Sequence, residues 1–175
     1  MTGTRIVLGL DPGSRRTGYG VLRSAPGPDG LVRLGSGTIR LDETRPFAER
    51  LPDLRDAILE VLRTYRPDEA VLETCFLSRG VRAALTLGHI RGVLLLLCLE
   101  AGLSVYEYSP SEVKRAVTGN GSAAKPQVGN MLRRLIHPPP AAAAGEDEVD
   151  ALAIAYCHLS RAAALSETRA LRTGP

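Results

Sequence analysis

The feature that most constrains the fold is an apolar run, residues 6–10, that ends abruptly in an acid, Asp11. Pro12 and Gly13 then predict a turn, and a second apolar run returns over residues 18–23. A carboxylate inside a buried sheet is costly, whereas one at the end of a strand can face a cleft and hold a cation. The same residues also fit a hairpin in which Asp11 caps its own turn. This stretch alone supports both interpretations equally.

Two glycines, Gly18 and Gly20, lie on the returning strand. Glycine weakens a strand interior, and it often marks a place where a ligand or another backbone comes close. We therefore expect something to approach this strand closely.

The remainder of the chain alternates between helical and strand-like segments. Predicted strands cover residues 6–11, 18–23, 31–41, 70–73 and 103–108. Predicted helices cover 47–64, with its regular start at Pro52, then 78–101, a helix capped by Ser109 and Glu112, 123–136 and 147–165. This order predicts an α/β fold with a mixed five-stranded sheet flanked by helices on both faces. In such a sheet Asp11 and Glu73 end two strands that can be neighbours.

The length of 175 residues fits one domain, placed at 1–165, with 166–175 expected to be a flexible tail. Cys75, Cys98 and Cys157 are odd in number and lack metal-ligand spacing, which favours free thiols in a reducing cytoplasm. No signal peptide is recognised, and the apolar run 93–99 falls short of the roughly 20 residues that span a bilayer.

Asp147 and Asp150 are three residues apart, so they share one face of the last predicted helix. If that face packs beside Asp11 and Glu73, four carboxylates converge and repel one another unless protonated or bound to metal. Oxygen ligands without His or Cys suit Mg²⁺ or Mn²⁺. Two such ions about 3.5–4 Å apart can activate water and stabilise the leaving oxygen in phosphodiester hydrolysis.

Each acid also has an ordinary structural explanation. Acids in the first turn of a helix favour its dipole, and Asp147 could be the N-cap. Glu73 could be a surface residue at a strand end. Glu146 lies four residues before Asp150 and could take the place of Asp147. Only the joint pattern, acids ending two strands and starting an apolar helix, favours a metal site.

Basic residues predominate through the middle of the chain, which carries a net charge of +3. A basic surface around an acidic cleft suits a polyanionic substrate and divalent metals. Lys125 follows a glycine-rich loop at a predicted helix start, where lysine and helix N–H groups can meet a phosphate. Lys114, Arg79 and Arg82 either follow a nucleic-acid backbone or are simply solvated. Phe76 is either a core residue or an exposed aromatic that stacks on an unpaired base.

A set of short blocks follows a known order along the chain: residues 8–14, 17–20, 73–76, 87–88, 91–93, 113–114, 119–125 and 147–155. Through these blocks the chain resembles the RuvC-type Holliday junction resolvases over nearly its whole length. The opening block alone would be weak, but these blocks in this order are highly specific.

The resemblance implies an RNase H-like fold, and therefore an RNase H-like nuclease domain at 1–165. It also implies a homodimer with two active sites that use Mg²⁺, two ions in each, with Mn²⁺ as a substitute. Each site would nick one of two opposed strands of four-way junction DNA and leave a 5′-phosphate and a 3′-hydroxyl. RuvA–RuvB, a branch-migration complex, is the implied partner.

The family's residue roles transfer to matching positions of this chain. Its metal-binding catalytic acids fall on Asp11, Glu73, Asp147 and Asp150. Its basic DNA-contacting residues fall on Lys114 and on Lys125, which would also offset charge at the reacting phosphate. Its aromatic after the second acid falls on Phe76.

Two other function classes compete with a nuclease. An actin-like phosphotransferase also opens with an acid, a glycine turn and a returning strand, but it needs a second lobe and a second glycine-rich phosphate loop. A junction-binding protein without catalysis is the other alternative, although four acids are a poor choice for binding a polyanion.

Overall fold

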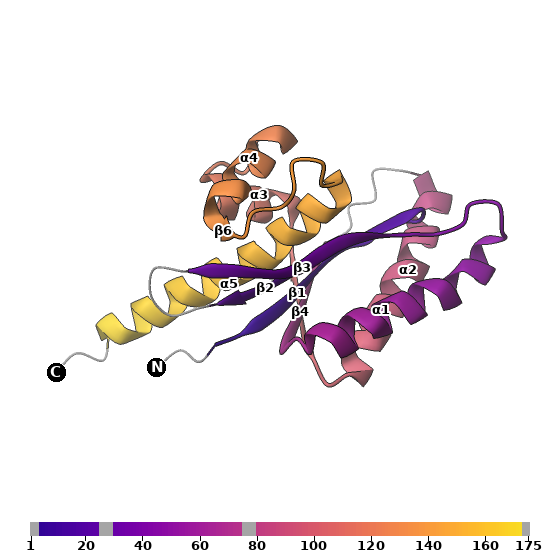
Figure 1. The fold of residues 1–175 in the computed structure, drawn as a ribbon, viewed down its shortest axis with the longest axis horizontal. Helices are drawn as coiled ribbons and strands as arrows, with labels where there is room; N and C mark the ends of the chain where they lie inside the picture. The colour runs from indigo at the N-terminus through magenta and orange to yellow at the C-terminus, as the bar shows by residue number, and fades with distance from the viewer. Residues whose placement is uncertain (1–3, 25–29, 75–79, 173–175) are drawn as a thin grey trace.

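A computed structural model of the chain describes residues 4–24, 30–74 and 80–172, with side chains described as far as Arg161. It contains one mixed sheet in the order β5-β4-β1-β2-β3-β6 (Figure 1). The strands are β1 (Ile6–Asp11), β2 (Arg16–Ser24), β3 (Leu31–Arg40), β4 (Glu69–Glu73), β5 (Ser104–Tyr108) and β6 (Ile136–His137). The first three form an antiparallel meander, and β4 and β5 join β1 in parallel. The predicted α/β class and meander are confirmed.

In the part of the chain that the structure describes, the sheet has six strands, so the expectation of five is wrong by one. The sixth, β6, has two residues and pairs in parallel with Leu31 and Val32 of β3. It follows directly on α4 (Lys125–Leu135), inside the region expected to be helical to residue 136. A strand of two residues shows no alternation of apolar and polar positions, so periodicity cannot reveal it.

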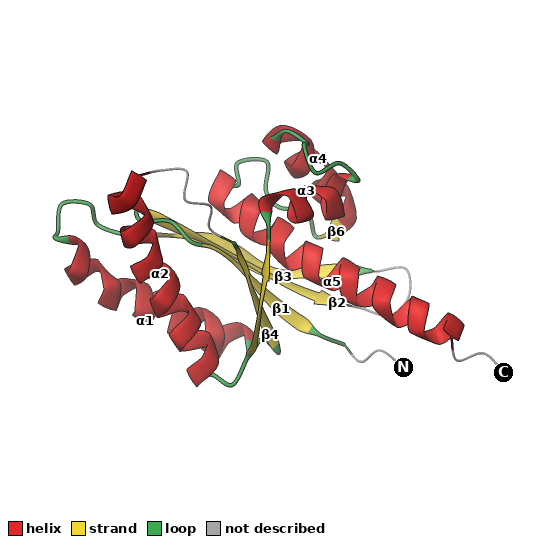
Figure 2. Ribbon diagram, turned by 180° about the vertical axis from the view of Figure 1, so that it is seen from behind, coloured by secondary structure: helices red, strands yellow, loops and turns green. Residues whose placement is uncertain are grey.

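Helices cover both faces of the sheet (Figure 2). The short 3₁₀ helix η1 (Phe47–Arg50) leads into α1 (Leu51–Tyr65), which lies on one face with α2 (Gly80–Glu100). The other face carries α5 (Glu146–Arg172), with α3 (Pro110–Thr118) and α4 beside it. Pro52 lies in the first turn of α1, and Ser109 and Glu112 form a capping box at α3, as predicted.

Side chains of a strand alternate between the two faces of the sheet, which divides the core into two layers. The same alternation decides on which face the acids at the strand ends lie. Val7 of β1 and Val71 of β4 pack in the cluster that contains α5, whereas Leu8 and Leu72 pack toward α1 and α2. Asp11 and Glu73 share the parity of Val7 and Val71 in their strands, so both acids are on the α5 face of the sheet.

The last helix, α5, continues to Arg172, beyond the predicted end at residue 165. Residues 166–172 are therefore helical, and the flexible tail expected at 166–175 stays a prediction. This stretch contains Glu, Leu, Ala and Arg, which are good helix formers, and the next glycine is at position 174.

Among the described helices, α2 is long and apolar enough to cross a membrane by length and composition, with a mean hydropathy of 1.6. The apolar run 93–99 is only part of this helix. Ile90, Leu94, Leu97 and Cys98 of α2 are buried in the core cluster shared with α1. One side of α2 is therefore a core surface, while Leu85 and Leu96 on the same helix remain exposed.

Candidate active site

Two neighbouring strands bring Asp11 and Glu73 together. Leu10 of β1 lies opposite Leu72 of β4 in a parallel pairing, so the next residue of each strand is one of the two acids. Parallel strands end at the same edge of a sheet, and the shared parity places both side chains on the α5 face. The prediction that these acids end neighbouring strands is confirmed.

Glycines allow α5 to lie directly on β1 and β2. A Cβ atom at Gly18 would collide with the carbonyl oxygen of Asp147, and one at Gly9 with that of Ala151. At Gly20 a Cβ atom would lie 2.7 Å from the backbone nitrogen of Leu152. The close approach expected at Gly18 and Gly20 is thus made by the backbone of α5, which brings its first turns to the end of β1.

The four acids line a single cleft of about 490 Å³ between the sheet edge, α2, α3, α4 and α5. Its polar lining includes Asp11, Ser14, Arg16, Glu73, Lys114, Lys125, Asp147 and Asp150. A neighbouring hollow of about 630 Å³ has a charged lining of Arg15, Arg16, Arg40, Glu43 and Asp147, and Arg16 and Asp147 are among the residues it shares with the cleft. Basic side chains therefore extend from the acidic cleft along the surface.

The carboxylates strongly influence one another's ionisation. The pKa of Asp11 is raised to about 7, mainly by burial and then by the charges of Asp150, Glu73 and Asp147, while the charge of Lys125 opposes the shift. The pKa of Glu73 is also raised, first by burial and then by Asp150. The site disfavours its own negative charge, and a cation placed among these oxygens would relieve that repulsion.

Two basic side chains already pair with the helix acids. The Lys125 ammonium nitrogen lies 2.7 Å from Asp150 Oδ2 and 3.6 Å from Glu146 Oε2. The hydrogen bond to Asp150 is the largest cause of a raised pKa at Lys125. Arg16 places Nε 3.0 Å from Asp147 Oδ2. Arg16 was not predicted as a site residue, because no local pattern of the sequence indicates its partner on α5.

The side chains favour Asp147 over Glu146 as the fourth acid. Asp147 lines the cleft with a side chain 22% exposed, whereas the Glu146 side chain is 80% exposed. Glu148 turns toward β3, where its Oε1 accepts a hydrogen bond of 2.7 Å from the Ser36 hydroxyl. Asp147 lies within α5, which begins at Glu146, so an N-cap role does not explain it.

The donor set fits a hard divalent cation, since every acidic group in the cleft offers carboxylate oxygens. Within the described ranges, however, no three His, Cys, Asp or Glu side chains are already gathered closely enough to hold a metal ion. The ion pairs with Lys125 and Arg16 occupy oxygens of Asp150 and Asp147. A bound cation would have to draw the carboxylates together and compete with both basic groups.

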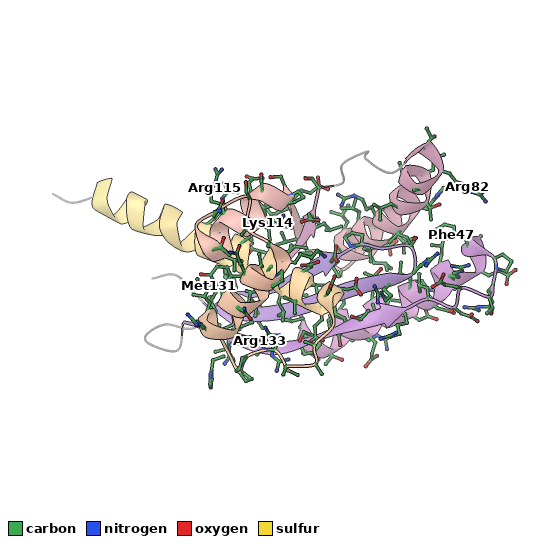
Figure 3. The ribbon with its side chains drawn as sticks, turned by 90° about the horizontal axis from the view of Figure 1, so that it is seen from above. Phe47, Arg82, Lys114, Arg115, Met131 and Arg133 are labelled. Atoms are coloured by element: carbon green, nitrogen blue, oxygen red, sulfur yellow. The ribbon has the colours of Figure 1, made fainter. Side chains whose placement is uncertain are left out.

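Of the other residues predicted from the sequence, some line the cleft and others do not. Lys114 and Lys125 line the cleft from α3 and α4. Arg82 is exposed on the first turns of α2, and Figure 3 shows it pointing outward, well away from Lys114. Phe76, Arg79 and Cys75 lie outside the described residues. Cys98 and Cys157 are buried free thiols, in agreement with the prediction for these two.

Known proteins resemble the chain in both sequence and structure. The sequence model described as "Crossover junction endodeoxyribonuclease RuvC" matches residues 7–158. The protein of that name from Chlorobaculum parvum is 47% identical over 165 residues, covering 92% of this chain and 84% of its own. The one from Alkalilimnicola ehrlichii is 47% identical over 159 residues, covering 89% of this chain and 92% of its own.

The solved structures agree with the sequence matches. T. thermophilus RuvC in complex with a Holliday junction substrate superposes with a TM-score of 0.80 at 33% identity, covering 90% of this chain and 94% of that one. The yeast mitochondrial Holliday junction resolvase Ydc2, with a TM-score of 0.68 and 14% identity over 94% of this chain and 82% of its own, shares the fold. With a family match over residues 7–158 and relatives at 47% identity, the chain belongs to the RuvC family of crossover junction endodeoxyribonucleases.

Proposed function

We propose that this endonuclease resolves four-way DNA junctions by nicking two opposed strands symmetrically, leaving a 5′-phosphate and a 3′-hydroxyl at each nick. The observation that carries the proposal is the cleft in which Asp11, Glu73, Asp147 and Asp150 meet Lys114 and Lys125. Nucleases of the RuvC family are metal-dependent. The complex of T. thermophilus RuvC with a Holliday junction supports the choice of substrate.

The four acids are the proposed metal ligands, with Mg²⁺ as the metal, two ions in each site and Mn²⁺ as a substitute. Such ions, when bound, supply Lewis acidity that activates a water and stabilises the leaving oxygen. Because the pKa of Asp11 is raised, ionisation of this carboxyl group and binding of a cation favour each other. The clustering of the four acids is therefore itself a reason for the site to bind a metal ion.

Lys125 has the proposed role of neutralising charge at the reacting phosphate. It stands at the first position of α4, 2.7 Å from Asp150 Oδ2, so its ammonium group is already at the cleft. Lys114, from α3, is the proposed contact to the DNA backbone. For Arg79, Arg82 and Phe76 the proposed DNA contacts rest on the sequence, with Phe76 stacking on an unpaired base.

A homodimer is the proposed assembly, since symmetric cleavage of opposed strands calls for two sites related by a two-fold axis. The exposed apolar side chains of α2 support it: Val81, Leu85, Leu96 and Leu99 are 79%, 61%, 56% and 59% exposed. A hollow of about 500 Å³, lined in part by Leu51, Leu85, Val93 and Leu96, could accommodate apolar side chains of a second copy. The branch-migration complex RuvA–RuvB is the further proposed partner.

The cytoplasm is the proposed location. The buried free thiols of Cys98 and Cys157 suit a reducing compartment. DNA is the proposed substrate, and in bacteria it lies in the same compartment.

Incubating the protein with a synthetic four-way junction, with and without Mg²⁺, tests the proposal. We expect paired nicks on opposed strands only when metal is present, and little cleavage of a linear duplex of the same sequence. Binding without nicking at any metal concentration would favour the non-catalytic alternative. ATP turnover without DNA would favour the actin-like phosphotransferase.

A further inference from the structure

A buried histidine lies on α5 outside the cleft. His158 is 5% exposed, and among the described residues it and Thr17 are the buried polar side chains. Its Nε2 lies 2.9 Å from Glu69 Oε2, and its Nδ1 lies 2.9 Å from the Tyr108 hydroxyl oxygen. Both ring nitrogens therefore have partners, one on β4 and one on β5.

The neighbourhood of His158 is built to hold the ring in place. The Tyr106 ring packs against it with centroids 4.4 Å apart. Arg161 lies 5.0 Å above the centre of the Tyr108 ring and donates a hydrogen bond of 2.7 Å to Glu112 Oε1, at the start of α3. On the opposite side, Arg5 Nη1 lies 3.7 Å from Glu69 Oε1. The histidine thus joins α5 to two strands, and its neighbours extend the connection to α3.

This cluster is connected to the acids through short backbone paths. Glu69 is the first residue of β4 and Glu73 is the last. Tyr108 lies opposite Glu73 in the β4–β5 pairing, and its carbonyl accepts a hydrogen bond of 2.8 Å from the amide of Thr74. On α5, His158 follows Asp150 by about two helical turns. His158 lies on α5, the helix that carries Asp150. It contacts β4, which carries Glu73, and β5, which lies beside Glu73.

The close glycine contacts do not by themselves fix α5 relative to β4. Gly9, Gly18 and Gly20 set how near α5 lies to β1 and β2. Smooth backbone surfaces can still slide, whereas hydrogen bonds from one ring to two strands have a defined position. Removing the ring would leave the Glu69 carboxylate and the Tyr108 hydroxyl without their buried partner, which favours a shift of the helix.

We infer that His158 is a positioning residue, which sets the placement of α5 along β4 and β5 and thereby the relation of Asp150 to Glu73. The inference rests on the proposed function, because it assumes that these two acids hold the metal. A neutral ring satisfies both partners: Nε2–H donates to Glu69, and Nδ1 accepts from the Tyr108 hydroxyl. Glutamine offers the same pair of groups, an amide N–H and a carbonyl oxygen, on one side chain.

Mn²⁺ binding to the full-length protein without DNA gives a readout that does not depend on cleavage. We expect His158→Leu to weaken Mn²⁺ binding about tenfold, the scale seen when groups behind metal ligands are removed. Tyr108→Phe, which removes one hydroxyl group and keeps the ring, should weaken it in the same direction. His158→Gln should restore much of the affinity. Junction binding in EDTA should stay unchanged in all three.

Leu159→Ala is the matched control, because Leu159 is the next residue of α5 and is also 5% exposed. It should lower the melting temperature without changing the Mn²⁺ affinity. Equal weakening by Leu159→Ala and His158→Leu at equal loss of melting temperature would overturn the inference. So would wild-type Mn²⁺ affinity in Tyr108→Phe, a variant that should fold even if His158→Leu does not. A wild-type protein that bound no Mn²⁺ and cut no junction would instead overturn the proposed function.

Discussion

Gly18 lies against the backbone of Asp147 so closely that a Cβ atom at Gly18 would collide with the Asp147 carbonyl oxygen. Gly18→Ala should therefore push the first turn of α5 away from β2 and move Asp147 with it. Misplacement of a reacting group by about 1 Å can cost about 100-fold in rate, so we expect a loss of that order in junction cleavage. Single-turnover cleavage of a saturating junction measures it.

Gly129→Ala is the control for this change. Gly129 is also buried, but a Cβ atom there would meet its nearest neighbours at 3.6 Å, an ordinary contact. This variant should cleave at the wild-type rate. Wild-type cleavage by Gly18→Ala as well would show that the close approach of α5 does not position the acids.

The pKa of Asp11 predicts a pH dependence of stability in the absence of metal. Its value rises from 3.8 to about 7 in the folded protein, so the folded state holds a proton that the unfolded state releases. Wild-type stability should therefore fall as pH rises through this window, and the fall should end above about 7. Asp11→Asn removes this titration. Its free energy of unfolding should therefore exceed that of the wild type, and the difference should grow with pH. Urea unfolding in EDTA from pH 4 to 8 checks it, and a margin independent of pH would contradict it.

Metal binding should show the complementary trend. Because a bound cation requires the ionised carboxylate, the stabilisation of the wild type by Mg²⁺ should be larger at pH 8 than at pH 6.

The parts of the candidate site that depend on short stretches of the chain were predictable from the sequence. Asp11 and Glu73 end apolar runs, and Gly18 sits where close approach was expected, so short patterns carried the information. Which of Glu146 and Asp147 faces the cleft depended on where α5 begins and how it lies on the sheet. Those are tertiary facts that spacing leaves open.

Three features had no adequate local signal. The Arg16–Asp147 ion pair joins residues far apart in the chain, and nothing beside Arg16 indicates its partner. The two-residue strand β6 exists only because β3 offers an edge to pair with. The exposed side of α2 could not be chosen, because leucines surround much of that helix and only packing distinguishes Leu94 from Leu96.

Lys125 and Lys114 should differ in the step they affect. Lys125→Ala should slow cleavage at saturating junction, since its ammonium group lies 2.7 Å from Asp150 Oδ2 in the cleft. Lys114→Ala should mainly weaken junction binding and lower the slope of log affinity against log salt by about 0.9. Binding isotherms at several salt concentrations and single-turnover rates separate the two. Equal effects on binding with no effect on rate would make Lys125 a backbone contact only.

The apolar face of α2 should hold two copies together. Leu96 is 56% exposed, and Leu96→Glu would place a charge in the proposed interface. The wild type should scatter light as a dimer, and this variant should shift toward the 18.7 kDa chain. Arg63→Glu, on an α1 side chain that is 70% exposed, should leave the dimer intact. A wild type found only at 18.7 kDa at micromolar concentration would contradict the assignment.

Four carboxylates in one cleft form the proposed metal site for cleavage. The most direct test compares metal-dependent nicking of a synthetic four-way junction by single variants: Asp11→Asn, Glu73→Gln, Asp147→Asn, Asp150→Asn and Glu146→Gln. The first four should lose cleavage and still bind the junction, because each substitution removes a negative charge and leaves the basic side chains of the cleft in place, whereas Glu146→Gln should keep its activity. Wild-type cleavage by any of the first four would contradict the claim. Loss of activity in Glu146→Gln, with activity kept in Asp147→Asn, would show that Glu146 and not Asp147 is the fourth acid of the site.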